Sequence, residues 1–141
     1  MDEAKDSVKK NRRTILVVDD EEDYRLTLER RLFQCGYDVV TAANGKHAIQ
    51  KIQSGKQFNL ILCDLKMPLV SGPDFLKVLR KAGIQVPVIV ITGHPEKESV
   101  QSAAQFGVSA VLLKPFKPND LMKKIEEVLA AHDSNATAST N

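Results

Sequence analysis

Residues 14–20 read Thr-Ile-Leu-Val-Val-Asp-Asp, a short run rich in β-branched residues that ends in two adjacent carboxylates. A run of this kind is typical of a strand buried on both faces, as the inner strands of a parallel sheet are. Similar runs recur along the chain, and a weaker one suits a strand at the edge of the sheet. The strong runs are residues 58–63, 87–91 and 109–113, and the weaker one is residues 37–41.

Between these runs, apolar residues recur at the three- and four-residue spacing of amphipathic helices. The helical stripes lie near residues 22–35, 45–54, 73–81, 96–105 and 118–131. The stripe near 96–105 is the sparsest, so we expect that helix to be weakly anchored. Alternating strands and helices with short connections predict an α/β fold: a doubly wound, five-stranded parallel sheet with helices on both faces.

The length of 141 residues fits one domain, which we place at residues 13–131. Residues 1–12 are polar and aperiodic, and we interpret them as a solvated N-terminal tail. Residues 132–141 are small and polar, which predicts a C-terminal tail or the start of a linker. The domain could act alone or as part of a longer protein, and the full gene length would decide between the two.

Composition argues for an ordinary soluble protein, with 43% hydrophobic and 27% charged residues. The net charge of +2 gives no strong reason to expect direct binding to nucleic acid or to a membrane. Cys35 and Cys63 lack the spacing of metal ligands and fit a reducing compartment. The chain starts without an apolar signal core and holds no stretch of membrane-spanning length, so we expect a cytoplasmic location.

Polar side chains stand where the predicted strands end, and the carboxyl ends of parallel strands share one rim of a sheet. Each of them has an ordinary explanation by itself. The aspartates could cap helices or form turns, the threonine could belong to a turn, and the lysine could be solvated. Their coincidence on one rim favours a functional site. The residues are Asp19 and Asp20 after the first strand, Asp64 after the third, Thr92 after the fourth and Lys114 after the fifth.

The chemistry of these side chains fits phosphoryl transfer. Clustered carboxylates suit Mg²⁺, with Mn²⁺ as an alternative, and a cation would relieve the repulsion between Asp19 and Asp20. Aspartate can act as a covalent phosphoryl acceptor, a role that we assign to Asp64. Lys114 would supply a positive charge to the transferred group, and Thr92 a hydroxyl donor.

At this point the chain resembles a known family, the receiver domain of two-component response regulators. The resemblance covers roughly residues 13–131 and implies the flavodoxin-like strand order 2-1-3-4-5. It is carried by four segments in the same order along the chain. These are Ile15-Leu16-Val17-Val18-Asp19-Asp20-Glu21, Asp64-Leu65-Lys66-Met67-Pro68 with Ser71-Gly72, Val90-Ile91-Thr92-Gly93, and Lys114-Pro115-Phe116.

The resemblance implies a role for each site residue. Asp64 would accept a phosphoryl group from a sensor histidine kinase or a histidine phosphotransfer protein. Asp19, Asp20, Asp64 and the backbone carbonyl of Lys66 would hold the metal ion. Thr92 would be the switch hydroxyl and Lys114 the phosphate-binding lysine. The Lys114–Pro115 peptide bond is expected to be cis, which is uncommon among X–Pro bonds.

The resemblance also implies a signalling module rather than an enzyme, one that catalyses only its own phosphorylation and its slow autodephosphorylation. Phosphorylation is expected to change the surface of residues 93–116, which would control a downstream output domain or protein. Residues 93–131 would offer a face for a homodimer. One departure stands out: Val111 occupies the position, three residues before the lysine, where the family often has Phe or Tyr. Lys66 and His94 are positions that vary between relatives, and either side chain could simply be solvated.

Three alternatives belong to other functional classes. A phosphatase of the haloacid-dehalogenase type would need Asp-x-Asp after the first strand, and Asp19-Asp20-Glu21 does not fit. A flavodoxin-like cofactor binder would need a glycine- or hydroxyl-rich phosphate loop there, whereas the acidic loop repels phosphate. A structural interaction domain that is never phosphorylated would have no use for the complete set of site residues.

Overall fold

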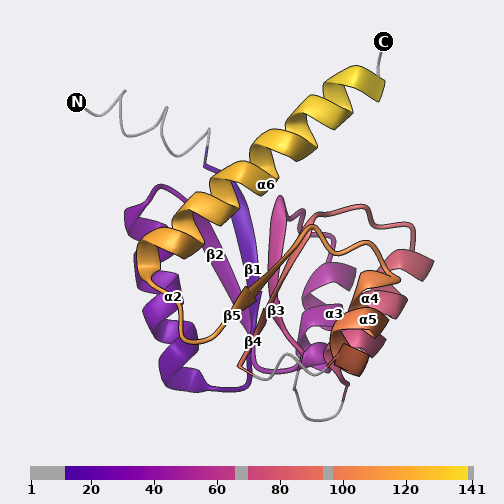
Figure 1. The fold of residues 1–141 in the computed structure, drawn as a ribbon, viewed down its shortest axis with the longest axis horizontal. Coiled ribbons are helices and arrows are strands. Elements are labelled where there is room, and N and C mark those ends of the chain that lie inside the picture. Colours follow the sequence, from indigo (N-terminus) through magenta and orange to yellow (C-terminus); the bar gives the residue numbers. More distant parts are fainter. Residues whose placement is uncertain (1–11, 66–69, 94–96, 140–141) are drawn as a thin grey trace.

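The computed structural model describes residues 12–65, 70–93 and 97–139, and within them five strands alternate with five helices (Figure 1). The strands are β1 (Thr14–Val18), β2 (Asp38–Ala42), β3 (Leu60–Asp64), β4 (Val88–Thr92) and β5 (Ala110–Leu113). The helices are α2 (Glu22–Gln34), α3 (Gly45–Gln53), α4 (Gly72–Lys81), α5 (Lys97–Ala104) and α6 (Pro118–Ser139). Within these ranges no helix is both long and apolar enough to cross a membrane.

The strands form one parallel sheet in the order β2-β1-β3-β4-β5, which confirms the predicted fold class and strand order. The register pairs Val18 with Cys63 and Thr92 with Leu113. The last residues of these strands and the residues that follow them therefore emerge together at the carboxyl edge. This alignment brings side chains far apart in the sequence to one rim.

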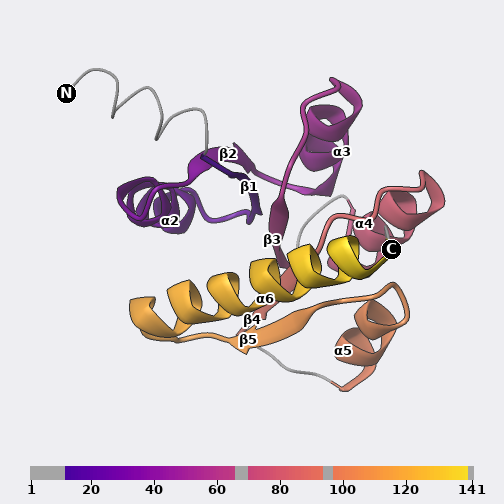
Figure 2. The ribbon, with the colours of Figure 1, turned by 90° about the horizontal axis from the view of Figure 1, so that it is seen from above.

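Helices cover both faces of the sheet, with α2 and α6 on one face and α3, α4 and α5 on the other (Figure 2). Each face has its own core of buried aliphatic side chains. Phe75 of α4 is fully buried in one core, and Leu121 of α6 is fully buried in the other. The helical stripes in the sequence are therefore the surfaces that pack against the sheet.

Helices α3 and α4 each begin at a side chain that caps the first turn. The side chain of Asn44 accepts a hydrogen bond from the His47 amide at 2.8 Å, and that of Ser71 accepts one from the Asp74 amide at 3.2 Å. Each bond satisfies an amide at the start of a helix that has no partner within the helix. Ser71 therefore sets the start of α4, the helix that follows β3 and its terminal aspartate.

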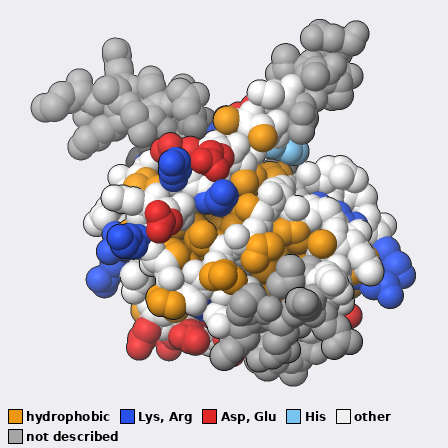
Figure 3. Space-filling model, in the orientation of Figure 1, with side chains coloured by type: hydrophobic (Ala, Val, Ile, Leu, Met, Phe, Trp, Pro, Cys, Tyr) orange, Lys and Arg blue, Asp and Glu red, His pale blue; other side chains and the backbone are white. Residues whose placement is uncertain are grey.

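Strand β5 differs from the prediction that residues 109–113 are buried on both faces. Val111 is 40% exposed and Leu113 is 50% exposed. β5 is the edge strand next to β4, and alternate residues face a side that the short helix α5 leaves open. Figure 3 shows hydrophobic side chains gathered on the face that β5 crosses. An apolar run alone does not tell a central strand from an edge strand.

Helix α6 also extends further than the prediction, which ended it near residue 131 and assigned 132–141 to a tail. It continues to Ser139. Asp133, beyond the expected end, forms an ion pair with Arg13, with 2.5 Å between Nη2 and Oδ2. No Gly or Pro interrupts residues 132–139, so no strong stop signal ends the helix there.

Candidate functional site

The carboxyl edge of the sheet gathers the predicted site residues that lie in the described ranges. Three polar side chains are buried at this rim: Asp19 is 2% exposed, Asp64 is 9% exposed and Thr92 is 1% exposed. Lys114 follows β5, and its amide donates to the Thr92 carbonyl at 2.8 Å, which continues the β4–β5 ladder past the last strand residue. Burial of polar side chains costs free energy, so a cluster of buried polar side chains indicates a functional site.

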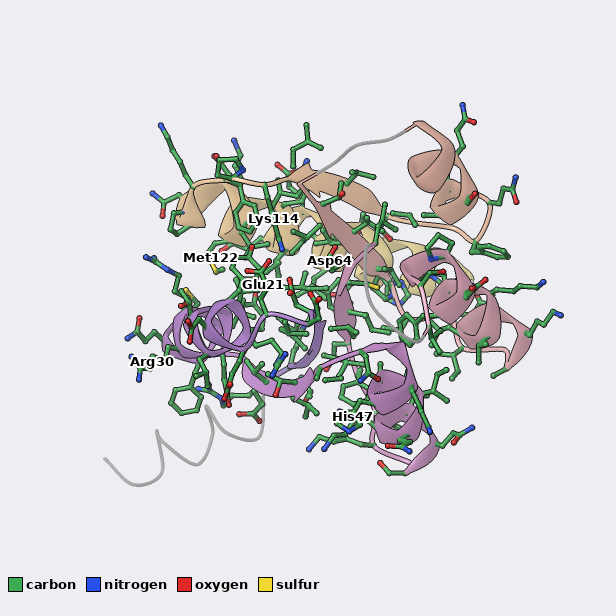
Figure 4. The ribbon with its side chains drawn as sticks, turned by 90° about the horizontal axis from the view of Figure 1, so that it is seen from below. Glu21, Arg30, His47, Asp64, Lys114 and Met122 are labelled. Atoms are coloured by element: carbon green, nitrogen blue, oxygen red, sulfur yellow. The ribbon has the colours of Figure 1, made fainter. Side chains whose placement is uncertain are left out.

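Lys114 links the two buried aspartates. Its Nζ lies 3.0 Å from Asp19 Oδ2 and 3.5 Å from Asp64 Oδ2. Figure 4 shows Lys114 and Asp64 directed toward each other from different strand ends, with Glu21 beside them. Burial of the ammonium acts to lower the pKa of Lys114, but the hydrogen bond to Asp19 and the surrounding carboxylate charges outweigh it, so the pKa is raised. The lysine therefore stays charged.

Asp19, Asp20 and Glu21 form an acidic cluster in which one carboxylate oxygen from each residue lies within 4.8 Å of the others. The turn that joins β1 to α2 brings them together, because the Glu21 amide donates to Asp19 Oδ1 at 2.9 Å. Asp20 and Glu21 are exposed. Hard oxygen donors with excess negative charge fit a Mg²⁺ ion.

Glu21 joins this cluster in addition to the predicted metal ligands Asp19, Asp20, Asp64 and the Lys66 carbonyl. The signal was present in the acidic run after the first strand. Lys66 and His94 lie outside the described residues. Val111, the position without the expected ring, is part of the exposed face of β5. The predicted cis bond between Lys114 and Pro115 is confirmed.

Tyr24, from the first turn of α2, is a second residue of the site that the sequence pattern does not mark. Lys114 Nζ lies 4.2 Å from the centroid of its ring. Burial, followed by the charges of the neighbouring carboxylates, raises the pKa of Tyr24 above its usual range. The tyrosine hydroxyl is thus kept neutral at the edge of the acidic site.

Gly72, the first residue of α4, packs against the backbone that follows the candidate acceptor. A Cβ atom at this position would lie 2.7 Å from Leu65 Cα and 2.9 Å from the Asp64 carbonyl oxygen. The Gly72 amide also donates to the Leu65 carbonyl at 3.1 Å. The absence of a side chain at residue 72 thus allows α4 to start directly beside Asp64.

Gly72→Ala is expected to lower the free energy of unfolding by about 1–2 kcal/mol. The backbone would have to shift to relieve the close contacts, which costs about 1–3 kcal/mol, and alanine recovers less than about 1 kcal/mol of helix propensity. Urea unfolding measures the difference, with the exposed Lys77→Ala on the same helix as control. A Gly72→Ala chain as stable as the control would contradict the steric argument.

Comparison with known proteins assigns the chain to one family. Residues 15–126 match the family described as "Response regulator receiver domain". The chain therefore belongs to the receiver domains of response regulators, which are signalling modules. This membership confirms the resemblance, and it favours the receiver interpretation over the phosphatase and flavodoxin-like alternatives.

Individual relatives agree with the family match. The chain is 34% identical over 122 residues to chemotaxis protein CheY1 of Helicobacter pylori, covering 84% of this chain and 98% of that protein. It is 31% identical over 125 residues to the alkaline phosphatase synthesis transcriptional regulatory protein PhoP of Bacillus subtilis, covering 89% of this chain and 52% of PhoP. The chain thus spans about half the length of transcriptional regulators such as PhoP and nearly all of CheY1.

Solved structures lead to the same conclusion. Chemotaxis protein CheY4 of Vibrio cholerae superimposes with a TM-score of 0.78 at 32% identity, covering 83% of this chain and 98% of that one. A CheY-like receiver domain protein of Methanospirillum hungatei superimposes with a TM-score of 0.82 at 31% identity, covering 89% and 99%.

Proposed function

We propose that the domain, residues 13–131, accepts a phosphoryl group on Asp64 from a phosphohistidine of a sensor histidine kinase or a histidine phosphotransfer protein. The observation that carries this proposal is the position of Lys114, whose ammonium lies within 3.0 Å of Asp19 and 3.5 Å of Asp64. A carboxylate nucleophile thus has a fixed positive charge beside it, where the oxygens of an incoming phosphoryl group would carry negative charge.

In the proposed reaction, an oxygen of Asp64 attacks phosphorus while the bond from phosphorus to the donor's histidine nitrogen breaks. The electron pair of that bond stays on the nitrogen, and a proton carried by the other ring nitrogen, or taken up from solvent, lets the donor leave as neutral imidazole. Lys114 and the Thr92 hydroxyl bind oxygens of the transferred group. A Mg²⁺ or Mn²⁺ ion bound by Asp19, Asp20 and Asp64, with the Lys66 carbonyl as a further predicted ligand, would offset the negative charge that accumulates at the rim.

We further propose that the product acts as a switch rather than as an intermediate of an enzyme. A phosphoryl group adds close to two negative charges and new acceptor oxygens at the rim, where Lys114 and Thr92 bind it in the phosphorylated state only. The surface of residues 93–116 would change and control an output domain or partner. The exposed Val111 and Leu113 support a protein contact or a homodimer on the 93–131 face. A cytoplasmic location stays a prediction from the sequence.

The proposal is tested by mapping the modified residue. The native chain is incubated with acetyl phosphate and Mg²⁺, the acyl phosphate is reduced with borohydride, and the product is sequenced by mass spectrometry. We expect modification at residue 64 that disappears when the metal is removed with EDTA. Modification at another residue, or none at all, would contradict the proposal.

Asp20→Asn is expected to weaken Mg²⁺ binding by at least about tenfold, equal to about 1.4 kcal/mol, because it removes one carboxylate charge from the acidic cluster. Calorimetric titration with Mg²⁺ measures the change. Glu22→Gln is the matched control, since it removes the charge of a nearby exposed residue outside the cluster. Equal affinities of the two variants would show that Asp20 is not a ligand.

A further inference from the structure

Lys114 has a third contact that the proposed chemistry does not use. Besides the two carboxylates, its ammonium faces the ring of Tyr24 at 4.2 Å from the centroid, which is within cation–π distance. The lysine side chain is 20% exposed and that of Asp19 only 3%, so the contact lies in a region with little water. Electrostatic attraction is stronger in such surroundings than in solvent.

The Tyr24 ring is itself fixed by a neighbour. It meets the ring of Phe116 edge to face, with 6.3 Å between centroids and 75° between planes. Phe116 follows Lys114 by two residues, so the segment after β5 contacts Tyr24 twice, once through the ammonium and once through the aromatic ring. Tyr24 and Phe116 both pack against the core cluster beneath α2 and α6. These contacts therefore hold the Tyr24 ring in a fixed orientation beside the site.

Packing alone does not account for an aromatic ring at this position. The Tyr24 hydroxyl oxygen is buried and has no hydrogen-bond partner among the described residues. A leucine would fill apolar space without burying an unpaired hydroxyl. What the aromatic ring adds, and leucine lacks, is a negative face toward the ammonium.

We propose that Tyr24 is a positioning residue for Lys114. The face of the Tyr24 ring holds the lysine ammonium between Asp19 and Asp64, where it can bind an incoming phosphoryl oxygen. Lysine is a compact charge on a flexible stem of four carbons, so its ammonium can shift unless several contacts hold it. The Tyr24 ring adds a third contact to those with Asp19 and Asp64. This inference rests on the proposed function, because it assigns a task to Lys114 in binding the phosphoryl group.

The contact itself can be tested without any phosphoryl donor. In the metal-free native chain, the ring current of Tyr24 is expected to shift the Lys114 ε-methylene protons upfield in the NMR spectrum. Tyr24→Phe keeps the ring and should keep the shift, whereas Tyr24→Leu should lose it. An unshifted signal in the native chain, or a shift that survives in Tyr24→Leu, would overturn the inference.

The effect of the Tyr24–Lys114 contact on phosphoryl binding is tested by titration with beryllium fluoride, a phosphoryl mimic, in the presence of Mg²⁺. Tyr24→Leu is expected to bind about 3- to 10-fold more weakly than the native chain, in the range of one cation–π contact. Tyr24→Phe should bind within about twofold of the native chain, because it keeps the ring. If the hydroxyl were the important group, Tyr24→Phe would bind as weakly as Tyr24→Leu. The matched control is Tyr37→Leu, at a tyrosine that packs against the same core cluster. Circular dichroism verifies that each variant is folded.

The outcomes separate the two proposals. If the native chain binds beryllium fluoride and Tyr24→Leu binds equally well, the positioning role is wrong and the proposed function stands. If Tyr24→Phe loses as much affinity as Tyr24→Leu, the ring is not the operative group and the inference is also wrong. If the native chain does not bind at all, the proposed function fails and the inference fails with it.

Discussion

Asp64→Asn is expected to take up no phosphoryl group from acetyl phosphate under conditions in which the native chain is labelled. The amide nitrogen and oxygen of asparagine match the carboxylate in size but lack its charge, and a neutral amide is a poor nucleophile for phosphorus. Asp64 is only 9% exposed and lies 3.5 Å from Lys114, so the substitution removes the carboxylate that we propose as nucleophile and leaves the lysine beside it in place. The gain in intact mass on incubation with acetyl phosphate and Mg²⁺ measures the effect.

The control for this experiment is Asp120→Asn, which makes the same chemical change at an exposed aspartate in the first turn of α6. It should be labelled like the native chain. Equal labelling of Asp64→Asn and Asp120→Asn would end the assignment of Asp64 as acceptor. Circular dichroism of both variants separates loss of the nucleophile from loss of the fold.

The rim was predictable because the backbone brings it together. Asp19 and Lys114 are 95 residues apart in the sequence, yet each follows directly after a strand of the same parallel sheet. In such a sheet, the last residue of each strand and the residue after it lie at the carboxyl edge. Recognition of the strands therefore placed the candidate carboxylates, hydroxyl and lysine without knowledge of any contact.

The surrounding residues were not predictable in the same way. Whether Tyr24 contacts Lys114 depends on how far α2 is rotated about its own axis. The buried residues Leu28 and Leu32 show which face of α2 packs on the sheet, but not its rotation to within one side chain. Glu21 joins Asp19 through the geometry of one turn. A helical tyrosine and an acidic turn residue each have common structural roles, so their types alone carry no signal for a site.

The exposure of the edge strand β5 and the end of helix α6 were the least accurate predictions. Val111 and Leu113 are as apolar as residues of a central strand, and their exposure depends on how short the covering helix α5 is. Helix α6 continues past residue 131 without a Gly or Pro to stop it, and Asp133 in this extension pairs with Arg13 from before β1. The exposure of β5 and the contact between Arg13 and Asp133 depend on how distant elements pack, which periodicity does not encode.

Arg80, a half-buried residue near the end of α4, fixes the opposite edge of the sheet. Its Nε donates to the Phe106 carbonyl at 2.8 Å, and Nη2 to the Gly107 carbonyl at 3.2 Å. Its Nη1 donates to the carbonyls of Ile84 and Val86 at 2.7 and 2.9 Å. The guanidinium thus joins the loop before β4 to the loop before β5, and its burial lowers the pKa of Arg80 while leaving it charged.

Arg80→Met is expected to lower the free energy of unfolding by about 3 kcal/mol. Methionine retains much of the apolar stem but donates no hydrogen bond, so four loop carbonyls lose a charged donor. Each such bond contributes about 1.5–3 kcal/mol, and water can replace the donor at the more exposed carbonyls, which reduces the sum. Urea unfolding of Arg80→Met is compared with Lys77→Met, which removes an exposed cation from the same helix and should change stability by less than about 0.5 kcal/mol. If the two variants unfold at the same urea concentration, Arg80 does not hold these loops.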